Sequence, residues 1–314
     1  MKNSSNTPVR ADLHFHSTLS DGSKTPIEIV ATAMGRDIEL LVNTDHDIVN
    51  TRTPELAKEA GIMSFEGVEI SAYEPSSDKH LHITCYAQKF SGRIHEILTH
   101  TRDGRKGKIT RQLERLRENG FDIDTDRFFQ RFGSQGVNTD NLSNSHLTEY
   151  IFESPENVAH IEHLTGEKLE YSMFLRECLK KEGKHAWIGG VEVPVYEPSV
   201  ESCGELAREN SALLSIAHPN FTFEDDIDRF DKIIMPYIEA GVRGIEINAA
   251  APRMWVETIL RVRDRYDLIL TFGSDCHFKP SGDGKHNELG SRNPYLSDEQ
   301  YGSMVERFME TVRR

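Results

Sequence analysis

Residues 12–23 read DLHFHSTLSDGS, a short apolar run that carries two histidines and then turns polar. An apolar run of this length, from Ala11 to His16, is typical of a buried β-strand. Side chains alternate between the two faces of a strand, so His14 and His16 project from the same side. Such a pair can bind one metal ion, although in most proteins it simply packs in the core. Asp21 follows in the predicted loop.

The alternation of short apolar runs with amphipathic stretches continues along the chain and predicts successive βα units. Thr25 and Pro26 begin the first predicted helix as N-cap and first helical position, and Gly35 ends it. About seven strands, linked mostly by helices, favour a (β/α) barrel over an open doubly wound sheet. Further strands are predicted at 40–44, 64–70, 80–87, 213–217, 244–248 and 268–272, and further helices from residue 54 and at 94–119, 227–240, 254–266 and 298–314.

The alternation stops between residues 120 and 199, where the sequence is polar and helix-prone. Its clearest segments are HLTEYIFESPENVAHIEHL and YSMFLRECLKK. We interpret 120–199 as an inserted helical subdomain, and 1–119 together with 200–314 as the catalytic barrel domain. No GxGxxG or Walker-type glycine loop follows the first strand, so enzymes that bind a nucleotide cofactor are poor candidates.

Composition limits the class of protein. The chain has 314 residues, 37% hydrophobic and 28% charged, which is enough for a substantial core. No run of about 18 apolar residues occurs, and the polar start lacks the apolar core of a signal peptide, so we expect a cytoplasmic protein without a membrane partner. The four cysteines show no CxxC spacing and are expected to be reduced structural thiols. The net charge of −14 argues against an extended nucleic-acid-binding surface.

Metal-ligand side chains also follow the later predicted strands. The apolar run LLVNT ends in Asp45, His46 and Asp47, and burying that much charge is costly unless it is paired or coordinated. Each motif alone is explained as readily by packing or by surface exposure. In a barrel, however, the C-terminal strand ends meet on one face, so together the motifs predict one shared metal site. The other members are Glu69 in FEGVEIS, a histidine in HLHITCY, His218 in LLSIAHPN, and Asp275 and His277 in LILTFGSDCH.

Imidazole nitrogens and carboxylate oxygens without thiolates suit Mn²⁺, Fe²⁺ or Zn²⁺. The ordered motifs HFH…D, TDHD, GVEIS, HI, AHP and GSDCH resemble those of the polymerase and histidinol phosphatase (PHP) domain superfamily, and the match covers nearly the whole chain. The insert and the segment TRDGRKGKITRQLERLRENG are similar to one branch of that superfamily. This branch contains nucleoside 3′,5′-bisphosphate phosphatases and enzymes that trim oligoribonucleotides from the 5′ end.

The resemblance implies a distorted, TIM-like (β/α)7 barrel with a trinuclear metal centre. His82 is chosen over His80 because the family's histidine directly precedes the isoleucine of this strand. Clustered cations would activate a water molecule as the nucleophile and neutralise charge on the phosphate. Carried over position by position, the resemblance implies three ion sites. One ion would be held by His14, His16, Glu69 and Asp275, a second by Glu69, His82 and His218, and a third by Asp21, His46 and His277. All of these residues except His82 and His218 are also the expected catalytic residues.

Substrate selection must come from residues outside this cluster. The run between Arg102 and Arg117 is basic in an otherwise acidic chain, although a solvated helix face explains any one of its members equally well. Arg105 and Lys108 are predicted to bind substrate because they match basic positions of the branch. His146 aligns with a histidine that opens a helix in the insert, and is predicted to bind phosphate.

Two departures from the branch bear on the substrate. Arginines tend to surround the insert histidine and to follow the HP motif in the branch, whereas this chain has Asn144, Glu149 and HPNFTF. If those arginines grip a second phosphate, their absence weakens the bisphosphate assignment. Another phosphomonoester, a cyclic phosphodiester or a short oligonucleotide end then remains open.

The leading hypothesis is a metal-dependent phosphatase or phosphodiesterase that acts on a nucleotide or another small phosphorylated metabolite. Asp45 and the metal-site histidines are candidates for a general acid. The main enzymatic alternative is amidohydrolase-like hydrolysis of a non-phosphate bond, but such enzymes usually add a bridging lysine, and none follows the strand ends quoted above. A degenerate domain that only scaffolds a partner is the third alternative, and the complete ligand set argues against it.

Overall fold

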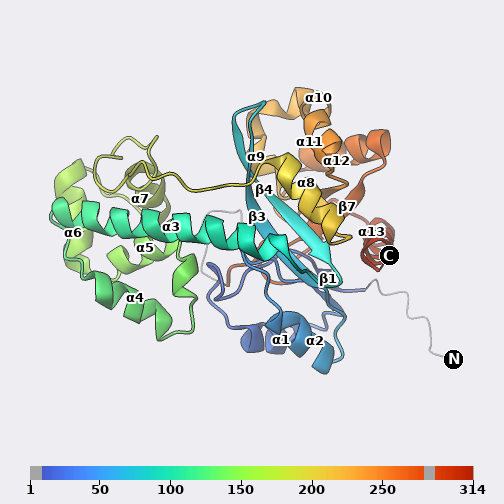
Figure 1. Ribbon diagram of the computed structural model, residues 1–314, viewed down its shortest axis with the longest axis horizontal. Helices are drawn as coiled ribbons and strands as arrows, with labels where there is room; N and C mark the ends of the chain where they lie inside the picture. Colours follow the sequence, from blue (N-terminus) through green and yellow to red (C-terminus); the bar gives the residue numbers. More distant parts are fainter. Residues whose placement is uncertain (1–8, 279–286, 314) are drawn as a thin grey trace. The chain divides into compact units, whose positions relative to one another are not determined.

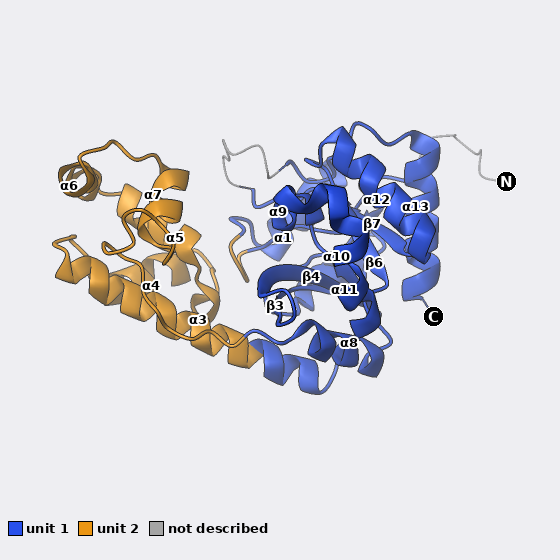
Figure 2. Cartoon of the chain, turned by 90° about the horizontal axis from the view of Figure 1, so that it is seen from above, with its two compact units in different colours: residues 1–17, 22–98, 197–314 blue, residues 18–21, 99–196 orange. Residues whose placement is uncertain are grey.

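The computed structural model describes residues 9–278 and 287–313. Contacts divide the chain into two compact units, which Figure 2 shows in different colours. The first unit comprises residues 1–17, 22–98 and 197–314, and the second comprises 18–21 and 99–196. The predicted division into 1–119 with 200–314 and an insert at 120–199 stays a prediction.

Among the described residues of the first unit, seven strands form two sheets. Strands β3, β4 and β5 pair antiparallel, whereas β5, β6 and β7 pair parallel. Figure 1 shows β3 and β4 as a long hairpin. The strands are β1 (Ala11–Asp12) paired in parallel with β2 (Leu40–Leu41), and the five-stranded sheet β3 (Glu66–Glu74), β4 (Lys79–Ala87), β5 (Leu213–Ile216), β6 (Gly244–Asn248) and β7 (Ile269–Gly273), in that order.

The fold is therefore mixed α/β, and the predicted (β/α)7 barrel is not confirmed. Isolated bridges join Phe15 to Cys276 and His46 to Glu69, but no continuous ladder closes the two sheets among the described residues. The predicted strand from Ala11 to His16 ends as regular structure at Asp12. One reason is local: the Asp12 carboxylate accepts the backbone N–H of His14 at 3.2 Å, so a side chain replaces a neighbouring strand as the partner.

Helices of the first unit begin and end largely where the sequence predicted. The hydroxyl of Thr25 accepts the backbone N–H of Glu28, whose side chain reaches back to Thr25, so a capping box begins α1. The predicted helix 227–240 is broken, because Pro236 lacks the N–H that would continue it. Arg314, the predicted end of the last helix, lies outside the described residues. The elements are α1 (Pro26–Gly35), α2 (Arg52–Glu59), α8 (Val200–Glu209), α9 (Pro219–Thr222), η2 (Glu224–Arg229), α10 (Phe230–Ile233), α11 (Met235–Ala240), α12 (Arg253–Tyr266) and α13 (Asp298–Val312).

Two buried tyrosines fix the segment that carries the first histidines. Tyr86 on β4 donates its hydroxyl to the carbonyl oxygen of Leu13 at 3.0 Å, and Tyr301 on α13 donates to that of Ala11 at 2.6 Å. Both rings pack in the main hydrophobic core, where Tyr86 meets Phe308 edge to face. The two hydroxyl groups thus supply hydrogen bonds to carbonyl oxygens that are not paired with a neighbouring strand, and they hold residues 11–13 in place.

The second unit is helical, and its core is separate from that of the first. Asn138 donates its backbone N–H to the carbonyl oxygen of Thr18 at 2.8 Å, and Asn141 donates its side-chain amide to Leu19 at 3.0 Å, which ties residues 18–21 to this unit. None of the helices in the described residues has the length and apolar composition needed to cross a membrane. The elements are α3 (Arg93–Glu118), of which residues 99–118 belong here, α4 (Thr125–Gly133), η1 (Thr139–Asn141), α5 (Asn144–Phe152), α6 (Pro155–Thr165) and α7 (Tyr171–Cys178), and the core includes Phe128, Phe132, Leu147, Ile151 and Phe174.

Candidate metal centre

His14 and His16 lie side by side in the interior of the first unit. Both are fully buried, and their ring centroids are 5.4 Å apart. A Cβ atom at Gly273 would lie 2.2 Å from the Cβ of His14, so only a glycine lets the end of β7 approach this segment. The predicted pairing of the two histidines on one side is consistent with this geometry.

The side chain of Glu69 is the centre of the cluster. It projects from β3, is fully buried, and lies among five imidazoles. Its Oε2 is 3.3 Å from Nε2 of His14, 3.2 Å from Nε2 of His16 and 3.1 Å from Nδ1 of His46, and its Oε1 is 3.2 Å from Nδ1 of His82 and 2.9 Å from Nε2 of His218. His82 rather than His80 therefore lies beside Glu69, which agrees with the choice made from the family resemblance, and metal ligation by His82 stays a prediction.

Asp275 completes the cluster from the end of β7. Its Oδ1 lies 3.2 Å from Nε2 of His16 and 3.7 Å from Nδ1 of His277. The backbone is left-handed at Asp275, with φ of 54°, and at His218, with φ of 28°. Non-glycine residues adopt this region at a cost, and such strain tends to persist where a side chain must be aimed at a functional site.

Donor atoms of the cluster gather in overlapping groups. Within each group all the ligand atoms lie within 4.8 Å of one another. Such spacing matches atoms that share one cation, because ligands at 2.0–2.2 Å on opposite sides of an ion are about 4 Å apart. The groups in the first unit are His14, His16 and Asp275; His14, Glu69 and His218; His46, Glu69 and His82; and His16, His46 and His277.

Asp21, the remaining predicted ligand, belongs to the second unit with the segment 18–21. Its side chain is buried. The loop closes tightly at Gly22, which donates its N–H to the carbonyl oxygen of Ser17 at 3.0 Å. A Cβ at Gly22 would lie 2.3 Å from the carbonyl oxygen of His16, so this turn also requires glycine. Ligation by Asp21 stays a prediction.

The predicted substrate-binding residues Arg105, Lys108 and His146 all lie in the second unit. Arg105 on α3 donates to the side-chain oxygen of Asn141 at 2.8 Å. His146 is buried at the start of α5, where its Nδ1 accepts the backbone N–H of Ser143 at 3.0 Å and completes a capping box. His146 therefore has a structural role in beginning this helix, and the binding roles of all three residues stay predictions.

A buried carboxylate outside the predicted set, Glu246 on β6, orients two of the histidines. Its Oε1 lies 3.0 Å from Nδ1 of His14, and its Oε2 accepts the backbone N–H of His218 at 2.5 Å. A carboxylate on Nδ1 fixes the imidazole tautomer that leaves a lone pair on Nε2. The sequence held a signal for this role, because Glu246 is a charged residue inside the apolar strand GIEIN and needs a buried partner.

Asp45 and Asp47, which flank His46, hold the surrounding backbone. Both oxygens of Asp45 accept hydrogen bonds from Ser17, through its N–H and its hydroxyl, each at 2.6 Å. Asp47 accepts the N–H and the hydroxyl of Ser71 at 2.8 and 2.9 Å. These bonds favour a positioning role for Asp45 over the proposed general acid.

The imidazoles and carboxylates of the cluster shift one another's pKa values. Burial lowers the pKa of His14, but the carboxylates Glu246, Glu69 and Asp275 outweigh it and raise the pKa well above its ordinary value. Burial raises the pKa of Glu69 and of Asp275, but the imidazoles around them hold both pKa values below the usual range. In the absence of cations, these directions favour a charged His14 paired with the buried carboxylates around it.

The donor set fits divalent cations. Nε2 of His14 and Oε2 of Glu69 are buried and make no hydrogen bond to any described residue, although they face one another. Buried polar atoms without a hydrogen-bond partner are rare, and here they point into a cluster of nitrogen and oxygen donors. Cations of the borderline or hard type would satisfy them.

Comparisons with known proteins find two relatives that are named for acting on phosphate esters. The chain is 26% identical over 275 residues to a phosphoribosyl 1,2-cyclic phosphate 1,2-diphosphodiesterase of Eggerthella lenta, covering 85% of this chain and 94% of that protein. It is 25% identical over 281 residues to a 3′,5′-nucleoside bisphosphate phosphatase of Chromobacterium violaceum, covering 86% and 88%. The chain is similar in sequence to these two bacterial phosphoesterases.

This similarity confirms the resemblance to nucleoside 3′,5′-bisphosphate phosphatases that the motifs predicted. Both phosphoesterase relatives are named for hydrolysis of phosphate esters, and the matches cover most of this chain. A solved structure from Bifidobacterium adolescentis, provisionally named a metal-dependent phosphoesterase, superposes with a TM-score of 0.71 over 98% of this chain and 100% of that one. Its identity is 23%, so it shows the fold alone. No family model matches the chain.

Proposed function

We propose that this protein is a metal-dependent phosphoesterase that hydrolyses a phosphate ester of a nucleotide or another small phosphorylated metabolite. One observation carries the proposal: five imidazoles lie within 3.3 Å of the oxygens of a single buried carboxylate, Glu69. A structural core has no need for so many ionisable groups, which are costly to bury. Cations shared between them explain the arrangement, and the two phosphoesterase relatives supply the reaction class.

The residues proposed to hold the ions are those of the cluster. His14, His16 and Asp275 would bind one ion, and Glu69 would bridge to ions held by His82, His218 and His46. When bound, such cations would supply an activated hydroxide nucleophile and neutralise charge on the phosphate. Glu246 would keep Nδ1 of His14 protonated, so that Nε2 offers its lone pair.

Three finer points complete the proposal. The number of ions is three, with Asp21, His46 and His277 holding the third, and the metals are Mn²⁺, Fe²⁺ or Zn²⁺. The two sheets would join in a distorted (β/α)7 barrel, which the isolated bridges at Phe15 and His46 support. We also propose that the protein works in the cytoplasm, where small phosphorylated metabolites are abundant.

Two measurements test this function. Protein purified without chelators is expected to contain stoichiometric divalent metal, and with added Mn²⁺ to release phosphate from, or open, at least one substrate in a panel of nucleoside monophosphates, bisphosphates and cyclic phosphates. Glu69→Gln is expected to lower kcat by at least about 1,000-fold, because it removes the shared anionic ligand. Glu66→Gln is the matched control on the same strand, where the Glu66 carboxylate accepts the backbone N–H of Phe90 at 2.6 Å.

Three outcomes would overturn the proposal. The first is full activity in Glu69→Gln. The second is turnover of amides or lactones with no action on any phosphate ester, which would favour the amidohydrolase-like alternative. The third is the absence of metal and of any activity, which would favour a scaffold.

A further inference from the structure

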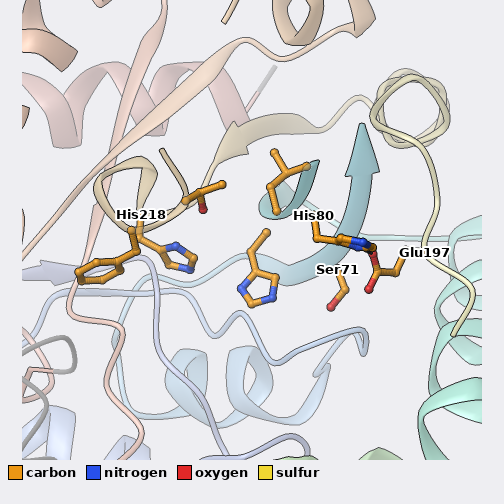
Figure 3. A pocket seen from close by; sticks show the side chains of 8 residues that line it. Ser71, His80, Glu197 and His218 are labelled. Carbon is orange, nitrogen blue, oxygen red and sulfur yellow. Dashed lines mark hydrogen bonds and ion pairs between the residues drawn. The ribbon is translucent and has the colours of Figure 1, made fainter. Parts of the chain in front are cut away.

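A small pocket opens beside the metal centre in the first unit. It has a volume of about 200 Å³, and its lining includes His82 and His218, two members of the cluster. Figure 3 shows His218 at one end of the pocket and His80 with Glu197 at the other. Whole ligands usually occupy about 300–1,000 Å³, so this pocket has room for one part of a substrate. The remaining lining residues are Ser71, Leu81, Phe221 and Thr222.

The far end of the pocket carries an anionic group that no metal-site role explains. The Glu197 carboxylate lies 2.5 Å from Nδ1 of His80, and its side chain is 23% exposed. Its backbone is held beside β3, because Tyr73 donates its N–H to the carbonyl oxygen of Pro198 at 3.0 Å. Ser199 then caps α8 by accepting the N–H of Ser202. Glu197 therefore has a fixed place on the pocket wall.

Apart from the histidines, the remaining lining residues carry no ionisable group. Ser71 contributes a hydroxyl, and the ring of Phe221, 5.8 Å from that of His218 between centroids, provides an apolar wall. No arginine or lysine is among the described residues that line the pocket. Lys79 lies nearby, but its ammonium group pairs with Asp226 at 3.2 Å and donates to the carbonyl oxygen of Thr222 at 3.3 Å.

We propose that this pocket receives the uncharged, hydroxyl-bearing part of the substrate, and that Glu197, oriented by His80, selects it. A carboxylate accepts hydrogen bonds from hydroxyl groups strongly, and it repels a phosphate at the same place. The side chain of Phe221 would pack against the carbon skeleton. This inference rests on the proposed function, because the phosphate to be hydrolysed is taken to lie at the metal centre next to His82 and His218.

The substrate class follows from that assignment. A phosphomonoester or cyclic phosphodiester of a polyol or sugar would fit, with its ring or chain hydroxyls facing Glu197. A compound that must place a second phosphate in this pocket would meet the carboxylate instead. Glu197 would thus be a specificity-determining residue, and His80 a positioning residue that acts through it.

Three non-hydrolysable probes test the inference: propylphosphonate, 2,3-dihydroxypropylphosphonate and propane-1,3-bisphosphonate. Their dissociation constants are measured by calorimetry with the full-length, Mn²⁺-loaded protein. Wild type is expected to bind the dihydroxy compound at least about tenfold tighter than propylphosphonate, a difference typical of one charge-assisted hydrogen bond. Glu197→Ala is expected to reduce this preference to within about twofold. Glu197→Gln is expected to improve binding of the bisphosphonate relative to propylphosphonate by about tenfold, because it removes the repelling charge.

The matched controls are Glu201→Ala and Glu201→Gln, exposed changes one turn away on α8 that leave the pocket intact. They are expected to keep every wild-type ratio. If all three probes bind wild type equally, or if Glu197→Ala keeps the hydroxyl preference, the inference is wrong while the proposed function stands. If no probe binds the metal-loaded protein, the proposed function fails and the inference fails with it.

Discussion

Replacing Glu246 by glutamine tests the role of the buried carboxylate behind the cluster. In the native chain its two oxygens take two donors, the Nδ1–H of His14 at 3.0 Å and the N–H of His218 at 2.5 Å. A backbone N–H can only donate, so the amide oxygen of the introduced glutamine must face His218. The amide NH₂ group then faces Nδ1 of His14 and can only donate to it. The proton of His14 must therefore move to Nε2, the atom that faces Glu69 and Asp275.

A protonated Nε2 has no lone pair for a cation. We therefore expect Glu246→Gln to weaken binding of the most tightly held Mn²⁺ by about 10–100-fold, which is about 1.4–2.7 kcal/mol. Metal dissociation constants measured by competition with a fluorescent chelator give this value directly. Circular dichroism and urea unfolding of the metal-free variant check that it folds.

Glu66→Gln is the control, because it also removes a carboxylate that accepts a backbone N–H but pairs with no histidine among the described residues. Its Mn²⁺ affinity is expected to stay within about twofold of wild type, since the cluster keeps all its donors. A folded Glu246→Gln protein with wild-type metal affinity would refute the tautomer argument, and would mean that His14 either does not bind metal or is oriented by other groups.

Two further predictions concern pH and thiols. In the metal-free protein the raised pKa of His14 gives stability that is fully present below its ordinary value of 6.5 and is lost as the pH rises through the folded pKa. The lowered pKa values of Glu69 and Asp275 give stability that is present above 4.5 and 3.8 and is lost as the pH falls. The free energy of unfolding, measured with urea from about pH 2.5 to 9 in EDTA, should therefore fall on both sides of a maximum. Saturating Mn²⁺ should remove the alkaline loss, and a flat profile in EDTA would contradict this. Burial raises the pKa of Cys85, Cys178 and Cys276 to about 12 and that of Cys203 further, so a disulfide reagent at pH 8 should label none of the four within minutes until the protein is denatured.

The cluster was predictable because the polar residues come directly after apolar runs. The apolar composition of the strands that end near His46, His218 and Asp275 predicts that these strands are buried. Strands β5, β6 and β7 are parallel, so their carboxyl ends lie at the same edge of the sheet. The choice of His82 over His80 needed the family pattern, since both histidines lie on the same face of β4. Only the structure shows why they differ: the carboxylate of Glu197, more than a hundred residues away in the chain, pairs with the imidazole of His80.

The strand directions could not be read in the same way. PSSD at residues 75–78 is a turn signal between β3 and β4, and it makes a hairpin where successive parallel units were expected. The two-residue strands β1 and β2 were expected to be longer, because an apolar run does not reveal that a side chain such as Asp12 will take a backbone N–H. Local hydrogen bonds of this kind depend on residues brought together only by the fold.

The missed residue Glu246 shows how the cluster and the sheet depend on one another. A carboxylate on the buried strand β6 would destabilise the fold if it stood alone, because an unpaired buried charge is costly. It is tolerated because His14 and the strained residue His218 both direct N–H groups at it. Those two histidines in turn face Glu69, so the buried carboxylates of Glu246 and Glu69 both depend on the same two residues. The same residues that would bind the cations therefore also hold β3, β6 and the segment around His14 together. We expect the loss of metal to lower the free energy of unfolding of the whole first unit.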